Sequence, residues 1–262
     1  MQRFSFVVCL MLLIAFPVVG QTYLSHAFLS VSCTNIFSNP ALMIEDSSNA
    51  PKFELAANYK SKLQMRELSV SDVSMGVMAS KNDKLAIGMV YEGYEQFNTA
   101  RTLMGYAKRL SGNVILGMQM EWRRIQQGDI YGSANAFMGG LGVRVNLTDQ
   151  LSASMALFNP NRSSLGNSRT AMSGSFMLHW RVSKQCTWLA SMQQNGALGI
   201  HYATQLQYQP SNRFYITFGA SSGLEPIQFS FVFRFDRMEL VARSSYHELL
   251  GFSPGAGIRF VK

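Results

Sequence analysis

The sequence predicts an all-β protein, a transmembrane antiparallel β-barrel of about 14 strands with an N-terminal periplasmic plug segment. Three observations predict it: short runs of alternating apolar and polar residues from Phe53 onward, a secretory signal, and connections that alternate between short and long. In the run from Val114 to Arg123, nearly every second residue is apolar. Successive strand side chains point to opposite faces, so each run has one apolar and one polar face. Around a closed sheet, this gives a lipid-facing surface and a polar lumen.

The first 20 residues have the form of a signal peptide. Arg3 supplies positive charge, residues 4–19 are apolar, and small residues precede Gln21. The apolar run is too short to favour a spanning helix, which needs ~20 residues. We therefore expect residues 1–20 to be cleaved and the mature chain to lie in the outer membrane of a Gram-negative cell.

Composition and charge limit the kinds of partner that we expect for this protein. Charged residues make up 15% of the chain, below the ~25% typical of soluble domains. The net charge is +8, but the basic residues are scattered singly, so we expect no nucleic-acid partner. Only Cys33 and Cys186 follow the signal peptide, and neither their number nor their spacing indicates a metal site, a cofactor or a disulfide framework. The expected partners are outer-membrane lipid and either a secretion-system protein or a hydrophobic ligand.

The alternating runs and turn residues place the strands and orient the barrel. Strands are expected at residues 53–60, 68–80, 84–92, 100–110, 113–125, 132–146, 150–158, 170–182, 186–193, 197–208, 213–221, 227–235, 238–246 and 255–261. Every second connection is very short, as at residues 236–237, whereas most of the others are longer, up to residues 159–169. Outer-membrane barrels have short periplasmic turns and longer external loops. Both termini are therefore expected on the periplasmic side.

Aromatic residues with outward parity fall near the two ends of the predicted strands. Near the external ends are Tyr59, Tyr91 and Trp122; near the periplasmic ends are Trp180, Trp188, Tyr208, Phe214, Phe235 and Phe260. Barrels in a bilayer carry aromatic girdles at both interfaces. A soluble β-sandwich has no reason to sort aromatic residues by height, so this distribution favours a membrane barrel.

Residues 21–52 lack the strand pattern but contain isolated apolar residues, which indicates that they are buried. The barrel mouth is the one place where this segment could be buried, so residues 21–52 are expected to form a plug and residues 53–262 the barrel. Pro40 suits a fixed turn, and two carboxylates, Glu45 and Asp46, follow the Asn39-Pro40-Ala41 element.

Four arginines have inward parity near the periplasmic end: Arg144, Arg181, Arg234 and Arg259. They are either ordinary polar filling of the lumen or an arginine belt that grips something anionic. Guanidinium groups form strong paired hydrogen bonds with carboxylates. We therefore expect Glu45, Asp46 or both to pair with this belt and hold the plug in the mouth.

Several motifs carry a resemblance to a known superfamily. The segment from Asn35 to Leu42, with its Asn39-Pro40-Ala41 core, resembles an element near the mature N-terminus of FadL-like outer-membrane barrels. Residues 91–97, 103–110 and 245–255 look like hairpins of the PorV/PorQ-type barrels of the Bacteroidetes type IX secretion system. The resemblance implies a fourteen-stranded barrel from a superfamily that includes fatty-acid and aromatic-hydrocarbon transporters. The chain departs from the transporters in its short external loops.

Three functions follow as hypotheses. The first is an accessory or structural barrel of a Bacteroidetes secretion or surface-assembly system, favoured because short loops leave little room for a ligand-capture site. The alternative is a FadL-like passive channel for hydrophobic small molecules. The third is a lipid-modifying enzyme, for which His247 beside Ser244, Ser245 and Glu248 is the one hydrolase-like cluster. That cluster fits a polar hairpin loop better, so we expect no enzymatic activity.

Overall fold

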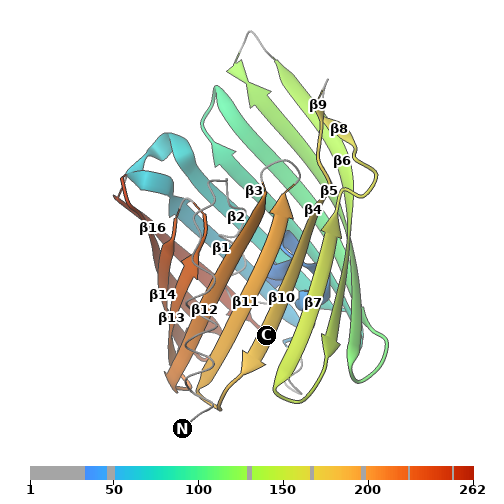
Figure 1. Ribbon diagram of the computed structural model, residues 1–262, viewed down its shortest axis with the longest axis vertical. Coiled ribbons are helices and arrows are strands. Elements are labelled where there is room, and N and C mark those ends of the chain that lie inside the picture. Colours follow the sequence, from blue (N-terminus) through green and yellow to red (C-terminus); the bar gives the residue numbers. More distant parts are fainter. Residues whose placement is uncertain are drawn as a thin grey trace.

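Fourteen strands close into a single antiparallel barrel in the computed structural model of the protein, which describes residues 33–45, 51–128, 132–165, 168–195, 199–223, 225–249 and 251–262. Each strand pairs with its neighbours in the sequence, and β1 pairs with β16 to close the sheet (Figure 1). The predicted fold class is confirmed. Among the described residues, no helix is long and apolar enough to cross a membrane.

The barrel strands are β1 (Phe53–Ser61), β2 (Ser69–Met78), β3 (Asp83–Gly93), β4 (Phe97–Arg109), β5 (Val114–Gln127), β6 (Ser133–Asn146), β7 (Leu151–Phe158), β10 (Ser173–Arg181), β11 (Cys186–Asn195), β12 (Ile200–Ser211), β13 (Phe214–Ser221), β14 (Ile227–Phe235), β15 (Met238–His247) and β16 (Gly251–Val261). Short 3-10 helices are η2 (Cys33–Phe37), η3 (Pro40–Met43), η4 (Lys62–Gln64) and η5 (Arg66–Leu68). A two-stranded ribbon of β8 (Ser164–Leu165) and β9 (Ser168–Arg169) lies in the connection between β7 and β10.

Several connections differ from the sequence-based expectation, and two of them have a clear structural reason. The last strand begins at Gly251, four residues earlier than expected, because Pro254 does not stop it. Pro254 pairs with Ser244 of β15 but lies one residue beyond the last partner of β1, which is Gly255. Its missing N–H therefore costs no hydrogen bond to β1. The connection after β7 carries the β8–β9 ribbon, which is too short to show as an alternating run.

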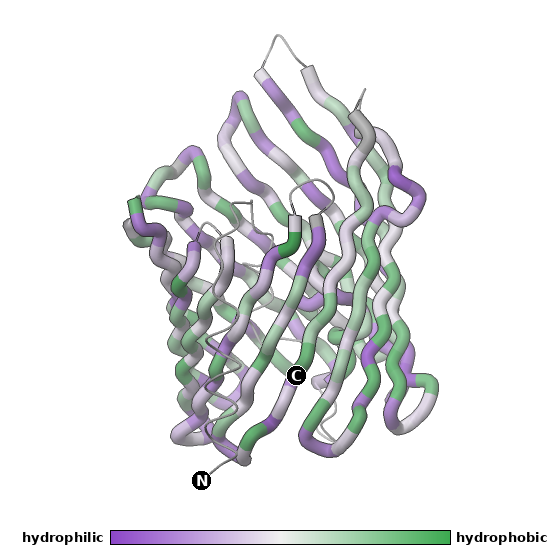
Figure 2. The backbone as a smooth tube through the Cα atoms, viewed as in Figure 1, coloured by the Kyte–Doolittle hydropathy of each residue, from purple (hydrophilic) through white to green (hydrophobic). Residues whose placement is uncertain are grey.

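Side chains alternate between lipid and lumen as expected, and Figure 2 shows apolar and polar residues following one another along the strands. On β5, Met118 is 55% exposed on the outside, whereas the neighbouring Gln119 is 5% exposed inside. On β4 the buried pattern places Arg109 inward and Lys108 outward. Leu103 and Ala107, which are buried on the same face as Arg109, agree with this register.

All nine expected girdle residues lie on the outer face of the barrel. Trp180 and Trp188 are cross-strand partners near the short-turn end, and their rings meet edge to face with centroids 6.3 Å apart. Trp188 also donates from Nε1 to Thr204 Oγ1 at 2.8 Å. At the opposite end, Trp122 is followed by five further residues of β5. This part of the wall is therefore taller than the rest, as Figure 1 shows for β5 and β6.

Candidate functional site

Residues 33–45 lie inside the barrel as two short 3-10 helices, η2 and η3, coloured blue in Figure 1. Here we call these residues the plug. Asn39 links the two helices, because its Oδ1 atom accepts a hydrogen bond of 2.9 Å from the backbone N–H of Ala41 at the start of η3. Pro40 fits the first helical position, where no N–H is needed. The Asn-Pro-Ala element therefore serves as a compact turn that starts η3.

Apolar burial anchors the plug to one side of the lumen. Ile36, Met43 and Ile44 are almost completely buried. They form a single cluster with apolar residues of β2 to β5: Val70, Ala86, Val90, Leu103, Ala107 and Ile115. Fully burying a side chain of this size contributes about 1.5–3 kcal/mol. Most of the plug's attachment therefore comes from apolar contact.

Five inward glycines on five consecutive strands receive the plug. A Cβ atom added at Gly88 would overlap Phe37, at Gly117 the backbone of Pro40 and Ala41, and at Gly142 the side chain of Asn39. We call this set, on β2 to β6, the glycine seat: Gly76, Gly88, Gly105, Gly117 and Gly142. Asn39 also donates from Nδ2 to the backbone oxygen of Met155 at 3.2 Å. The plug backbone thus lies directly against the strand backbone.

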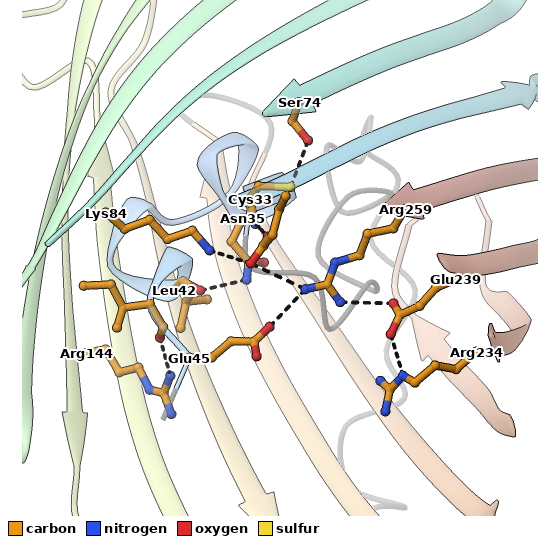
Figure 3. A network of polar contacts seen from close by, with 12 residues as sticks. Cys33, Asn35, Leu42, Glu45, Ser74, Lys84, Arg144, Arg234, Glu239 and Arg259 are labelled. Carbon is orange, nitrogen blue, oxygen red and sulfur yellow. Dashed lines mark hydrogen bonds and ion pairs between the residues drawn. The ribbon is translucent and has the colours of Figure 1, made fainter. Parts of the chain in front are cut away.

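A buried network of charged side chains joins the plug to the first strand, β1, and to the last two strands, β15 and β16 (Figure 3). Glu54 of β1 accepts from the backbone N–H of Cys33 at 2.9 Å and from Lys84 Nζ of β3 at 2.6 Å. Arg259 of β16 donates to Glu239 of β15 at 3.0 Å, and its Nη2 atom lies 3.5 Å from Glu54. The network therefore spans the seam where β1 meets β16.

The structure joins two of the four predicted belt arginines, because Arg234 and Arg259 both donate to Glu239. Arg259 Nη2 lies 3.2 Å from Glu45 Oε1, and Arg234 donates to Glu239 at 2.7 Å. Arg144 instead donates to the backbone oxygen of Ile44 at 3.4 Å. Arg181 is exposed at the end of β10. The expected pairing of a plug carboxylate with these arginines is thus present between Glu45 and Arg259, whereas a wall carboxylate receives Arg234 and a plug carbonyl receives Arg144.

Of the two expected plug carboxylates, Asp46 lies outside the described residues. Glu45 is mostly buried, and this burial raises the pKa of its carboxyl although Arg259 acts in the opposite direction. Arg109 donates to the backbone oxygen of Glu45 at 3.1 Å. The end of the plug is therefore held through backbone oxygens at two points, Ile44 and Glu45, as well as through one ion pair.

Cys33, the first residue of the plug, lies in a buried environment. Its thiol lies 3.5 Å from Ser74 Oγ and is fully buried. Burial, and then the nearby Glu54 carboxylate, raise the pKa of this thiol to about 12. The thiol is consequently neutral and poorly reactive while the plug is in place.

A cavity of about 230 Å³ lies between the plug and the strands β4 to β7, β10 and β11. Its apolar lining includes Phe37 of the plug together with Met138, Phe158 and Met177 of the wall. Phe158 lies over Gly140, where an added Cβ would collide with its ring. The cavity therefore offers an apolar surface inside a lumen that has polar residues on most strands.

One polar cluster borders this cavity. Arg101 donates to both oxygens of Glu121 at 2.8 Å, and Arg123 donates to Oε1 of the same carboxylate at 2.7 Å. All three side chains line the cavity. Two guanidinium groups thus share one carboxylate at the cavity wall.

The connection after β7 covers the cavity on the external side. Asn159 and Thr170 both line it, and Asn159 Nδ2 donates to the backbone oxygen of Thr170 at 2.8 Å. Asn159 Oδ1 also accepts from the N–H of Ser163. These bonds tie the two ends of the connection together over the lumen.

The hydrolase-like cluster around His247 lies where β15 ends and turns into β16. His247 accepts a hydrogen bond at Nδ1 from the N–H of Leu249, so it stabilises its own hairpin. Within the described part of the chain, no group of three or more His, Cys, Asp or Glu side chains could hold a metal ion.

Solved structures with the same architecture are outer-membrane barrels. The toluene transporter TodX of Pseudomonas putida matches with a TM-score of 0.63 and 10% identity, covering 93% of this chain and 97% of that one. A TodX deltaS2S3 mutant channel matches with a TM-score of 0.62 and 12% identity, covering 93% and 99%. A FadL homologue of Pseudomonas aeruginosa matches with a TM-score of 0.56 and 9% identity, covering 94% and 97%. At such identities, the likeness shows the fold alone.

The sequence itself matches no protein-family model and no curated protein.

Proposed function

We propose that the protein is an outer-membrane channel for hydrophobic small molecules and that these bind in the cavity beside the plug. The observation that carries the proposal is the apolar lining of that cavity by Phe37, Met138, Phe158 and Met177. Small-molecule sites are typically concave and mostly apolar, with a few polar groups that orient the ligand. The Arg101–Glu121–Arg123 cluster supplies such polar groups at one side.

Barrel architecture supports a place in the outer membrane, because the outer surface is apolar and β1 begins where β16 ends, at the end of the barrel that carries the short turns. The fold shared with a toluene transporter and a FadL homologue supports a channel. Such a channel requires no catalytic group, and we propose that the protein is not an enzyme.

The accessory role in a type IX secretion system, which the sequence favoured, has weaker support. It was preferred because short external loops leave little room for a capture site. The cavity is instead built inside the lumen, with Asn159 and Thr170 of a single loop closing it. Short loops are therefore compatible with a binding site, and the reason for preferring the accessory role no longer applies.

The test is uptake of N-phenylnaphthylamine, a hydrophobic fluorescent probe that an intact outer membrane excludes. Cells that carry the wild-type barrel should take up the probe faster than cells with an empty vector. Met177→Trp, which fills the cavity, should return uptake to the empty-vector rate. Leu178→Trp changes the adjacent lipid-facing residue and should leave uptake unchanged.

Two results would contradict the channel function. In the first, the wild-type barrel is present in the outer membrane but does not increase uptake of the probe. In the second, cells with Met177→Trp and cells with Leu178→Trp take up the probe at the same rate. Western blotting of outer-membrane fractions establishes that each variant is inserted at the same level. A large protein that co-purifies with the barrel while uptake stays at the vector rate would favour the accessory role.

A further inference from the structure

A second, smaller cavity of about 30 Å³ lies in the lumen near the external end, away from the plug. Its lining includes Lys60, Thr217, Gln228, Ser230, Arg243 and Ser245. The loop between β13 and β14 closes over it, because Glu225 of that loop forms an ion pair with Lys60. The cavity shares none of its lining residues with the larger one.

The strand register places a row of cross-strand partners from five neighbouring strands along this cavity. Lys60 of β1 is opposite Gly255 of β16, and Gly255 is opposite Arg243 of β15. The row continues from Arg243 through Ser230 of β14 to Thr217 of β13. Gly255 leaves the space in which the Arg243 side chain lies, since an added Cβ would stand 3.1 Å from its Cγ and Nε atoms.

Arg243 is partly buried, and one N–H group of its guanidinium lacks a hydrogen-bond partner. Its Nε atom is sealed from solvent and has no hydrogen bond, and Arg243 makes no ion pair with any described residue. The two nearby carboxylates are engaged elsewhere: Glu225 pairs with Lys60, and Asp72 accepts from Asn58 at 2.8 Å. A sealed N–H group that lacks an acceptor is costly, so the space beside Arg243 Nε favours a hydrogen-bond acceptor such as a small anion.

The rest of the lining also presents hydrogen-bond donors. Thr217, Ser230 and Ser245 each offer a buried hydroxyl, and Gln228 offers an amide. One water needs about 10–15 Å³ of such space, so the cavity has room for an anion the size of chloride or a carboxylate. A sulfate with four oxygens is too large.

We propose that this cavity is a binding site for a small monovalent anion, held by Arg243 and the hydroxyls of Thr217, Ser230 and Ser245. The site is independent of the proposed channel function, because it involves a different cavity. The bound anion accepts the hydrogen bond from Arg243 Nε that no described group accepts.

The experiment measures line broadening of ¹³C-formate by the full mature barrel in a non-ionic detergent. Wild-type protein should broaden the signal, and chloride should reverse the broadening by competition. Sulfate at the same ionic strength should not. Arg243→Gln should weaken formate binding roughly ten- to hundredfold, the usual effect of losing a charged hydrogen bond. Arg181→Gln removes the same charge from an exposed position and should leave binding unchanged.

Three results would overturn the proposal: no broadening by wild type, equal broadening by Arg243→Gln, or sulfate competing as well as chloride. If Arg243→Gln does not fold, the double variant Thr217→Val and Ser230→Val keeps the cation and removes two hydroxyls. It should bind formate more weakly than wild type, and unchanged binding would contradict the site.

Discussion

Docking of the plug can be measured through its own cysteine. Ile36 is completely buried and contacts the glycine seat at Gly105. Truncating a buried isoleucine to alanine costs about 2–5 kcal/mol, and each 1.4 kcal/mol changes an equilibrium about tenfold. If about 3 kcal/mol of this cost falls on docking, Ile36→Ala raises the undocked population about a hundredfold.

The assay is the rate at which a maleimide labels Cys33 at pH 8, in a Cys186→Ser background that leaves one thiol in the mature chain. In the docked plug, the pKa of this thiol is about 12, against an ordinary value of 9.0. The reactive thiolate is therefore about a thousandfold scarcer than in a free thiol. Labelling must then proceed mainly through the undocked state, so Ile36→Ala should accelerate it up to about a hundredfold.

Ile87→Ala is the matched control, because it makes the same change on the outward side of β3. It should leave the labelling rate within about twofold of wild type, since lipid-facing side chains do not contact the plug. Two findings would refute the reasoning: a wild-type thiol that reacts as fast as an exposed one, or Ile36→Ala and Ile87→Ala with the same rate. Deleting residues 21–46 gives an independent measurement, because the deletion should open an ion conductance in planar bilayers.

Further predictions concern the wall and the external loops. Met118→Arg should destabilise the barrel by roughly 2–4 kcal/mol in an unfolding assay, whereas Gln119→Arg on the lumen side should cost much less, and equal costs would contradict the register. An epitope tag within residues 159–169 should be visible on intact cells, whereas one within residues 209–212 should be hidden until the outer membrane is opened. Lys60 lowers the pKa of Glu225 although burial alone would raise it, so their ion pair stabilises the loop above the ordinary carboxyl pKa of 4.5 and is lost as pH falls below it. Amide hydrogen exchange in this loop should therefore speed up on acidification, and Glu225→Gln should abolish that pH dependence.

Sequence reasoning located the strands well because lipid and lumen impose opposite chemistry on alternate residues. The same alternation placed every girdle residue on the outer face. Sequence reasoning failed where the alternation was locally broken, as at Pro254. A strand tolerates a proline only where no neighbouring strand requires a hydrogen bond from that position, and the sequence alone does not show this.

The charge pairs of the lumen could not be predicted in the same way. Arg259 meets Glu54 and Glu239, which are far apart in the sequence, only because β1, β15 and β16 become neighbours when the barrel closes. Glu54 and Lys84 were therefore missed. The alternation of residues in the sequence shows that both side chains point into the lumen, but their partners depend on the register of every strand pair.

The glycine seat was also missed, although the sequence contained a signal for it. Inward glycines on five successive strands are unusual for residues that are unfavourable within strands. Only when the five positions are considered together do they predict that another segment approaches the wall.

The glycine seat has a consequence for how the barrel assembles. At the level of the plug, the strands β2 to β6 carry glycines where other barrels would have side chains. A wall formed without residues 33–45 would enclose water against bare backbone at those positions. The segment therefore completes the interior of this half of the barrel, as a hydrophobic core does in a water-soluble domain. Docking of the segment is thus expected to stabilise the closed sheet, so a barrel that lacks the segment should close but be less stable.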